Sequence, residues 1–425
     1  MKSKDPVILR TNKSEGTKDM KNPIRPFAVI LVFVLTAILF TACSAKTVDG
    51  TSPEEGNIPV QILYDYVVQA ETITNLDYEY AKQELLNMTD GWGGKCSAAA
   101  KVLPNGDMVV GRNMDYFISN CPCIIVHTKD PGYHETYGIC YNNSTGPTFE
   151  DVKTNGLSPD YAKLMPFLAN DAMNEEGLYV EMNMRINERF DDPADDYGCP
   201  GTNPEASERV CEIMLAQLIA MNCADIDEML EYVHSIDIFT MNKGDAPWNL
   251  AFIAADATGR YGLLEIARNQ ISWIEGQPIQ TNYYITESFA ANETKKMGVG
   301  RYAVLEKELP DVQTEENMQA LMDKVSYFQI YFPATCKFDF RTELVDDFPE
   351  WNYDFVTDPA NWGFMMEYMG EDVEMLSSAT RQDIQEMNSI WETTFNNLVN
   401  CTKKTMRLRF FEDKEKVVTL SFDAE

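Results

Sequence analysis

The chain contains one stretch in which a thiol, a guanidinium and a carboxylate are closely spaced: Cys96-Ser-Ala-Ala-Ala-Lys-Val-Leu-Pro-Asn-Gly-Asp-Met-Val-Val-Gly-Arg-Asn-Met-Asp115. The turn-forming residues Pro104-Asn-Gly-Asp107 separate two short apolar runs, which predicts a β-hairpin. Such a hairpin would fold Arg112 and Asp115 back beside Cys96. The three side chains would then meet at one strand end, which is an arrangement suited to a nucleophile and its supporting groups.

A cysteine nucleophile acts as the thiolate, so a base must take its proton. The chain has only three histidines, at positions 127, 134 and 234, and none has a papain-like context. If cleavage makes Cys96 the first residue, its α-amino group can serve as the base, since the pKa of such amines in peptides is roughly 7.7 to 8. The alternative is a buried structural cysteine, which is the more frequent role of a lone cysteine.

The spacing of Cys96 and the run Gly111-Arg-Asn-Met-Asp115 resembles the choloylglycine hydrolase family of linear amide C-N hydrolases, which includes bile salt hydrolases and penicillin V acylases. Members are N-terminal-nucleophile enzymes whose cysteine becomes the first residue of the mature chain. The resemblance implies an α+β fold, a four-layer αββα sandwich of the N-terminal-nucleophile hydrolase type. It also implies cleavage between Lys95 and Cys96, and a reaction that needs no metal and no organic cofactor.

The family assigns roles at the matching positions. Asp115 would accept a hydrogen bond from the freed amine, and Arg112 would lower the pKa of the thiol by its positive charge. The structural alternatives are a turn-capping aspartate and a surface arginine.

An oxyanion formed from an amide carbonyl needs fixed hydrogen-bond donors, and the resemblance implies two asparagines. Asn183 follows the Asn174-Glu-Glu-Gly-Leu178 landmark, although one residue fewer separates them than in the family. Asn282 lies in Gln280-Thr-Asn-Tyr283, which matches the family's Thr-Asn pair. Arg301, in Gly300-Arg-Tyr302, takes the place of a supporting arginine. Turn or strand-end asparagines and a surface arginine are the alternatives.

The N-terminal region reads as an export signal. A basic stretch ends at Arg25, an apolar run covers residues 27–41, and Ala42-Cys43-Ser44 resembles a bacterial lipobox. The apolar run is short for a transmembrane helix. We therefore expect a lipoprotein signal over residues 1–43, with lipidation of Cys43 and an exported, membrane-anchored or extracellular protein. A plain signal anchor is the alternative.

Residues 44–95 form a tether and a candidate propeptide. Residues 44–56 are polar and are typical of a flexible tether. Apolar positions from about Ile58 to Leu86 predict a helix. Glycines at 91, 93 and 94 would let the backbone bend for self-cleavage at Lys95.

Residues 96–425 are expected to form the catalytic domain. The pattern predicts two amphipathic helices, at 207–221 and 224–235. It also predicts two hairpins, one at 248–265 and one formed by 405–411 with 416–422. Strands with helices between them favour a layered α+β fold. An aromatic and methionine-rich stretch at 362–368 is ascribed to the core or to a pocket wall.

Composition excludes some functions. The chain has 425 residues, 44% of them hydrophobic, which is enough for a large core, and its formal net charge of -32 argues against nucleic-acid binding. Cys121-Pro-Cys123 is too tight for a common zinc site. Most of the ten cysteines are expected to be small buried apolar residues, with one or two disulfides left open.

Together with the export signal, the resemblance implies an exported amidase that hydrolyses a small N-acyl compound through an acyl-enzyme on Cys96. Conjugated bile salts, penicillin V, acyl homoserine lactones and other N-acyl compounds all stay open as substrates. Two other classes stay open: an acyltransferase or peptidase with the same nucleophile, and an unprocessed surface-anchored binding lipoprotein. The oligomeric state is also open, with a homo-oligomer as one option.

Overall fold

The computed structural model of the chain describes residues that fall within one compact unit, Thr47–Glu425. Among the described residues, no helix is both long and apolar enough to cross a bilayer. Four features of the sequence lie outside the described residues: Cys43, residues 44–55 of the tether, the glycines before Lys95 and the 362–368 stretch. The described residues are 56–87, 95–117, 121–141, 146–186, 201–239, 248–267, 270–290, 298–326, 328–330, 390–410 and 413–422.

The larger of two main sheets has nine strands, and all its neighbouring pairs are antiparallel except β2 with β5. Its inner and outer faces both carry apolar side chains, so the sheet is covered on both sides. In spatial order its strands are β1 (Val60–Tyr64), β2 (Val67–Ala70), β5 (Cys123–Thr128), β6 (Thr136–Tyr141), β7 (Asp171–Asn174), β8 (Tyr179–Ile186), β11 (Trp248–Ala255), β12 (Tyr261–Ala267) and β13 (Gln270–Glu275).

The smaller main sheet has seven strands and carries Cys96. A short parallel pair, β9 (Arg209–Cys211) with β10 (Asp237–Phe239), stands apart from both sheets. The strands of the smaller sheet are β14 (Ile279–Gln280), β3 (Lys95–Val102), β4 (Met108–Phe117), β16 (Ile390–Asn400), β17 (Thr405–Phe410) and β18 (Asp413–Ser421), with β15 (Phe328–Ile330) paired to β16.

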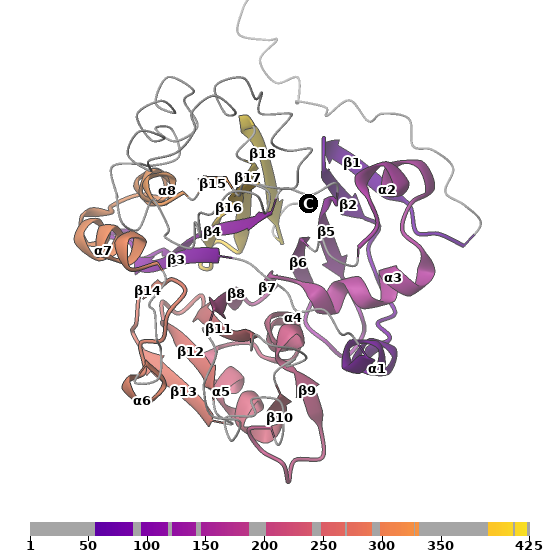
Figure 1. Ribbon diagram of the computed structural model, residues 1–425, viewed down its shortest axis with the longest axis horizontal. Coiled ribbons are helices and arrows are strands. Elements are labelled where there is room, and N and C mark those ends of the chain that lie inside the picture. Colours follow the sequence, from indigo (N-terminus) through magenta and orange to yellow (C-terminus); the bar gives the residue numbers. More distant parts are fainter. Residues whose placement is uncertain are drawn as a thin grey trace, which may run out of the picture. The chain divides into compact units, whose positions relative to one another are not determined.

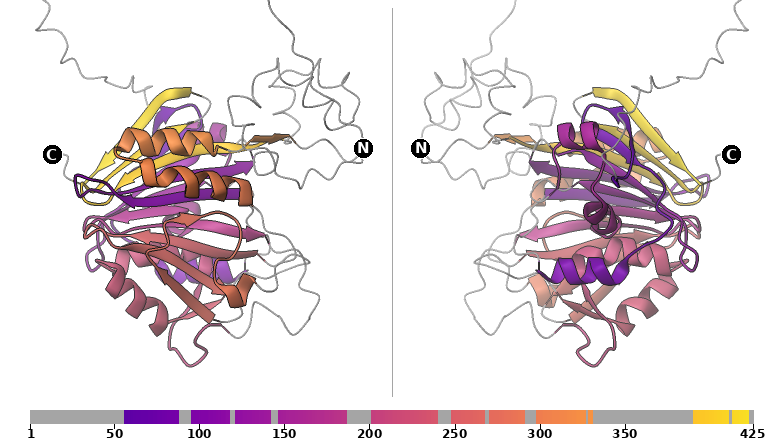
Figure 2. Two further views of the ribbon diagram at one scale, coloured as in Figure 1. Left: turned by 90° about the vertical axis from the view of Figure 1, so that its left-hand side faces the viewer. Right: turned by 90° about the vertical axis from the view of Figure 1, so that its right-hand side faces the viewer.

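The two sheets pack face to face, because one buried apolar cluster takes residues from both of them. On the outer face of the larger sheet, two further apolar clusters pack five helices against the strands: α1 (Tyr78–Asn87), α2 (Phe149–Asn155), α3 (Pro159–Leu164), α4 (Leu215–Asn222) and α5 (Ile226–Ser235). On the outer face of the smaller sheet lie α7 (Val299–Glu308) and α8 (Glu315–Lys324). Figure 1 shows this separation of the helices, and Figure 2 shows the stacked strands from two sides.

Four short helices complete the described elements: α6 (Glu287–Ala290) and the 3-10 turns η1 (Met165–Leu168), η2 (Glu212–Met214) and η3 (Leu309–Asp311). Seven cysteines lie in the described ranges, and none of these seven forms a disulfide. Their burial fits the expectation of small apolar residues.

Three predicted hairpins are confirmed. β3 and β4 pair around the turn at Pro104 to Asp107, β11 and β12 pair around Asp256 to Gly259, and β17 pairs with β18. The predicted second helix is also confirmed as α5, whose N-terminus is capped by the Asp225 side chain accepting from the Glu228 backbone N-H.

Two helix predictions are wrong in part. Residues 58–77 do not form a helix, because the β-branched run around Val60 and Val67 pairs as β1 and β2 across a turn in which Tyr66 has a φ of 62°. Only α1 is helical there. The predicted helix at 207–221 begins as β9 and η2, and α4 itself is buried on nearly every side rather than amphipathic.

Candidate active site

The β3–β4 hairpin places the thiol of Cys96 on the face of the smaller sheet that points toward the larger sheet. Cys96 is paired with Met114, and Ala98 with Arg112, so these side chains share one face. Gly106 closes the turn at a φ of 92°, a conformation that glycine adopts without strain. The predicted approach of Arg112 to Cys96 is thus built into the hairpin register.

The sulfur of Cys96 is almost completely enclosed, with only 2% of the residue exposed. Nη2 of Arg112 and Sδ of Met114 each lie 3.6 Å from Sγ. Burial raises the pKa of this thiol to about 12; the charge of Arg112 lowers the pKa, whereas the charges of Asp115 and Glu181 raise it further. Arg112 thus lowers the pKa of the thiol as expected, but the desolvation of Cys96 outweighs this effect in the uncleaved chain.

Arg112 is fully buried and is held from several sides. Its Nε lies 3.1 Å from Oδ1 of Asp171 and 3.4 Å from Oε2 of Glu181, and its Nη2 donates to the Met182 carbonyl oxygen at 3.3 Å. The guanidinium carbon lies 5.1 Å from the ring centre of Phe395. Because these contacts come from β7, β8 and β16, the position of Arg112 depends on both sheets.

Asp115 faces the opposite side of β4 from Arg112, as the alternation of a strand requires. Its Oδ2 lies 2.9 Å from Nη1 of Arg301 on α7, and its Oδ1 accepts from the Thr393 hydroxyl at 2.5 Å. The same Arg301 nitrogen donates to the Cys96 carbonyl oxygen at 3.1 Å. Asp115 therefore lies at the backbone of Cys96, beside the bond that would be cleaved, because its Cα is paired with that of Lys95.

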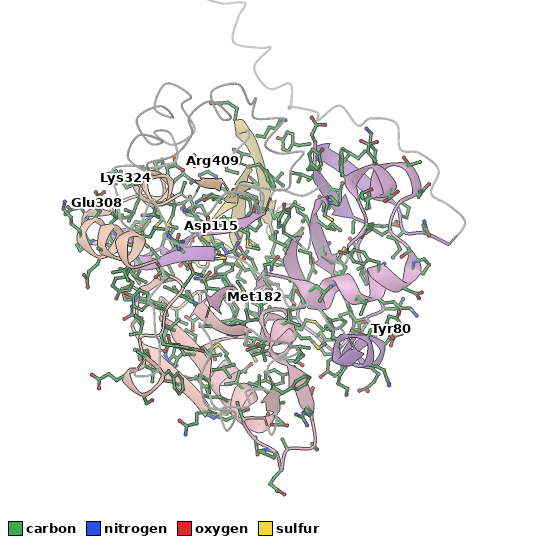
Figure 3. All side chains as sticks on the ribbon, in the orientation of Figure 1. Tyr80, Asp115, Met182, Glu308, Lys324 and Arg409 are labelled. Carbon is green, nitrogen blue, oxygen red and sulfur yellow. The ribbon has the colours of Figure 1, made fainter. Side chains whose placement is uncertain are left out.

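Asn282 contacts the backbone nitrogen of Cys96. Its Oδ1 accepts from the Cys96 N-H at 3.3 Å and from Nη2 of Arg301 at 2.8 Å, while its Nδ2 donates to the Met184 carbonyl oxygen at 2.7 Å. Its amide thus spans the two main sheets at the point where Cys96 begins. Figure 3 labels Asp115 and Met182 near the middle of the described residues, whereas Glu308 and Lys324 lie toward the rim.

Asn183 lies on β8 between Met182 and Met184, whose carbonyls accept from Arg112 and Asn282. It shares a strand face with Glu181, two residues before it. Asn183 is fully buried, and neither polar atom of its side chain has a hydrogen-bond partner among the described residues. An unsatisfied buried amide is costly, so this side chain is available to a ligand group.

Asn174, the first residue of the Asn174–Leu178 motif that precedes Asn183, has a structural role. Its side chain donates to the carbonyls of Ala220 and Cys223 and accepts from the backbone N-H groups of Glu176 and Leu178. It fastens the β7–β8 turn to the end of α4, and in this way it positions Asn183.

Sequence reasoning missed Asp171, Glu181 and Thr393. Glu181 is a charged residue within the apolar strand run that ends at Asn183, which is a signal that could have marked it. Asp171 is likewise a charged residue in a buried strand, β7. Thr393 reaches Asp115 from 278 residues away, so no local pattern could have indicated it.

Comparisons with known proteins add a fold-level likeness only. No family model matches the sequence, and no curated protein matches it significantly. The structure is similar to a mutant of the conjugated bile acid hydrolase from Clostridium perfringens, at 14% identity and a TM-score of 0.38, over 78% of this chain and 93% of that one. It is also similar to penicillin V acylase from Agrobacterium tumefaciens, at 11% identity and a TM-score of 0.36, over 77% and 86%.

Proposed function

We propose that this protein is an amide hydrolase that uses Cys96 as its nucleophile after cleavage of the Lys95–Cys96 bond. The observation that carries the proposal is that Arg112 contacts the sulfur of Cys96, while Asn282 and Arg301 bind its backbone nitrogen and carbonyl oxygen. On the facing strand, the side-chain amide of Asn183 has no hydrogen-bond partner within the described part of the chain. The order helix, sheet, sheet, helix supports the αββα sandwich of the N-terminal-nucleophile type as the finer description of the fold.

Cleavage would supply the missing base. In the uncleaved chain the backbone nitrogen of Cys96 is an amide, and the thiol pKa of about 12 leaves almost no thiolate at neutral pH. Hydrolysis of the bond adds one water, which leaves a carboxylate on Lys95 and a free amine on Cys96. That amine is bonded to the same Cα as the thiol side chain, so it can take the thiol proton.

The catalytic cycle then has two halves. Sγ attacks the substrate carbonyl carbon, the C-N bond breaks, and the leaving amine receives the proton held by the Cys96 amine. Water, deprotonated by the same amine, next attacks the thioester, which releases the acid and restores the thiol. Attack on the carbonyl creates an oxyanion, and we assign the side-chain amides of Asn183 and Asn282 as its hydrogen-bond donors. Donors fixed before the reaction stabilise this charge without reorganisation.

Arg301 and Asp115 would hold the new N-terminus of the chain. Arg301 already binds the carbonyl oxygen of Cys96, and Asp115 binds Arg301 and is paired with Lys95, the residue before the nitrogen that would become the amine. A buried carboxylate next to an ammonium stabilises the ammonium, so Asp115 together with Arg301 would set the pKa of the Cys96 amine.

The segment before Cys96 would remain bound after cleavage. β2 pairs with β5 of the larger sheet, and Val67, Val68, Ala81 and Leu85 are buried in the main clusters. Release would expose this apolar surface to water. If Cys43 is lipidated, the retained segment would anchor the catalytic part to a membrane without a covalent link.

Intact-mass and N-terminal analysis of the purified protein, beside a Cys96→Ala variant, tests the proposal. A wild-type chain starting at Cys96 and an uncleaved variant, followed by release of amine from N-acyl amides such as a conjugated bile salt or penicillin V, is the expected result. An intact wild-type chain would instead favour the unprocessed binding protein. Transfer of the acyl group to an added amine, or cleavage of peptides, would favour an acyltransferase or a peptidase.

A further inference from the structure

Two carboxylates share the guanidinium that contacts the proposed nucleophile. Asp171 and Glu181 are directly opposite each other on β7 and β8, and both lie within 3.4 Å of Nε of Arg112. All three side chains are fully buried. Like charges directly opposite on neighbouring strands destabilise a sheet, so this pairing calls for a functional explanation.

The charges around the sulfur of Cys96 do not favour ionisation of the thiol to a thiolate. Arg301 and Asp115 form one neutral pair, whereas Arg112 provides one positive charge beside two carboxyl groups. Burial raises the pKa of Asp171, so the negative charge that competes directly with the thiolate is that of Glu181. A thiolate on Cys96 would add a further negative charge. Arg112 of β4 and Glu181 of β8 lie on the thiol side of the smaller sheet, whereas Asp115 acts on the thiol through its charge from the opposite face of β4. Arg301 of α7 acts through Asp115, and Asp171 of β7 acts through Arg112.

Asp171 has contacts that do not involve Arg112. Asp171 accepts hydrogen bonds from the Tyr179 hydroxyl at 3.0 Å and from Nδ2 of Asn397 at 2.9 Å, which anchor it independently of Arg112. Removing the charge of Glu181 would therefore leave Arg112 fixed by Asp171 and by the Met182 carbonyl.

We propose that Glu181 is a positioning residue that competes with Cys96 for the charge of Arg112 and so keeps the thiol protonated until the amine of Cys96 is freed. The catalytic meaning of this competition rests on the proposed function. The effect on thiol ionisation does not, because it follows from the contacts of Arg112 alone. Cleavage would leave an ammonium on the Cα that carries the thiol side chain and a carboxylate on Lys95. The cation stays bonded to Cys96 and the carboxylate does not, so the new charge nearer the sulfur would favour the thiolate.

The test is the rate at which iodoacetamide alkylates Cys96 between pH 7 and 9, followed by mass spectrometry of the peptide that contains it. Digestion with a protease that does not cleave after lysine gives cut and uncut chains different peptides, so each form is measured separately. Below the thiol pKa the rate follows the thiolate fraction, and a Glu181→Gln variant should react about three- to tenfold faster, since one pKa unit is tenfold. Glu181→Asp should return the rate toward the wild-type value.

Glu212→Gln is the matched control, because Glu212 is also a buried glutamate but lies on the outer side of the larger sheet. Its rate should equal that of the wild type. An unchanged or slower rate in Glu181→Gln, or an equal increase in Glu212→Gln, would overturn the proposal. Absence of amide hydrolysis together with the expected rates would overturn the proposed function instead and leave the competition for Arg112 standing.

Discussion

Arg301 and Asp115 form a fully buried ion pair, 2.9 Å apart, between residues that are 186 positions apart in the chain. One nitrogen of this arginine also binds the carbonyl oxygen of Cys96, and the other binds Asn282. The pair therefore connects α7, β4 and the start of β3. It holds the backbone of Cys96, whereas Arg112 contacts the sulfur.

Replacement of Arg301 should be costly, because it leaves a buried carboxylate without its partner. We expect Arg301→Met to lower the free energy of unfolding by about 3–5 kcal/mol, measured by urea denaturation, and Asp115→Asn in the same chain to restore part of the loss. Arg260→Met is the control: Arg260 pairs with Asp227 and Glu275 at the surface, and its loss should cost no more than about 1 kcal/mol. Equal losses in the two single variants would contradict the expectation.

Stability should depend on pH through Glu212. Burial raises its pKa well above the usual value, and the Leu250 backbone N-H lowers it only in part. The fold thus favours the protonated form, so the contribution of Glu212 is fully present below the unfolded pKa of about 4.3 and is lost as the pH rises through the folded pKa. Glu212→Gln should gain stability relative to the wild type from pH 4 to 7, by at most about 1.4 kcal/mol per pH unit.

Glu275→Gln provides a control of opposite sign for that series. The hydrogen bond from Arg260 holds the pKa of Glu275 below its usual value. Its contribution is present above the unfolded pKa and is lost as the pH falls through the folded pKa. This variant should be less stable than the wild type at pH 7, with the difference shrinking toward pH 4. The same sign for both variants in thermal unfolding would refute the assignment.

The segment before Cys96 should co-purify with the rest of the protein after cleavage. Denaturing gels and native size-exclusion chromatography would show two chains in one peak. Leu85→Asp, which puts a charge into the cluster under α1, should release the segment or unfold the protein, whereas Gln83→Asp on the exposed side of the same helix should do neither. A single chain in the wild-type peak after cleavage would rule out retention.

Gly177 should be intolerant of a side chain. It has a φ of 88°, and a Cβ there would lie 2.4 Å from the carbonyl oxygen of Cys401. Gly177→Ala should cost about 1–2 kcal/mol from the backbone conformation alone, plus about 1–3 kcal/mol for the crowding. Gly106→Ala, with a φ of 92° and open space around it, should show only the first cost. Similar unfolding midpoints for the two variants would contradict this account.

Local sequence was sufficient for the β3–β4 hairpin and hence for the meeting of Cys96 with Arg112. A turn with Asn105 and Gly106 between two short apolar runs has few alternatives, and the register then follows from the turn. The same reasoning predicted β11 with β12 and β17 with β18. It failed at 58–77, where the spacing of apolar residues predicted a helix. These residues instead contain β1 and β2, and β2 pairs with β5 of the larger sheet.

The sequence by itself determined the nucleophile candidate, the nearby arginine and the two hairpin strands that carry them, because these depend on residues close in the chain. Only the tertiary structure decided that Asp115 binds Arg301 and Thr393 on the opposite strand face, and that Arg112 is shared with Asp171 and Glu181. Those contacts join β4 to β7, β8, β16 and α7. Their energies come from the burial of charges between packed layers, which a local sequence pattern does not encode.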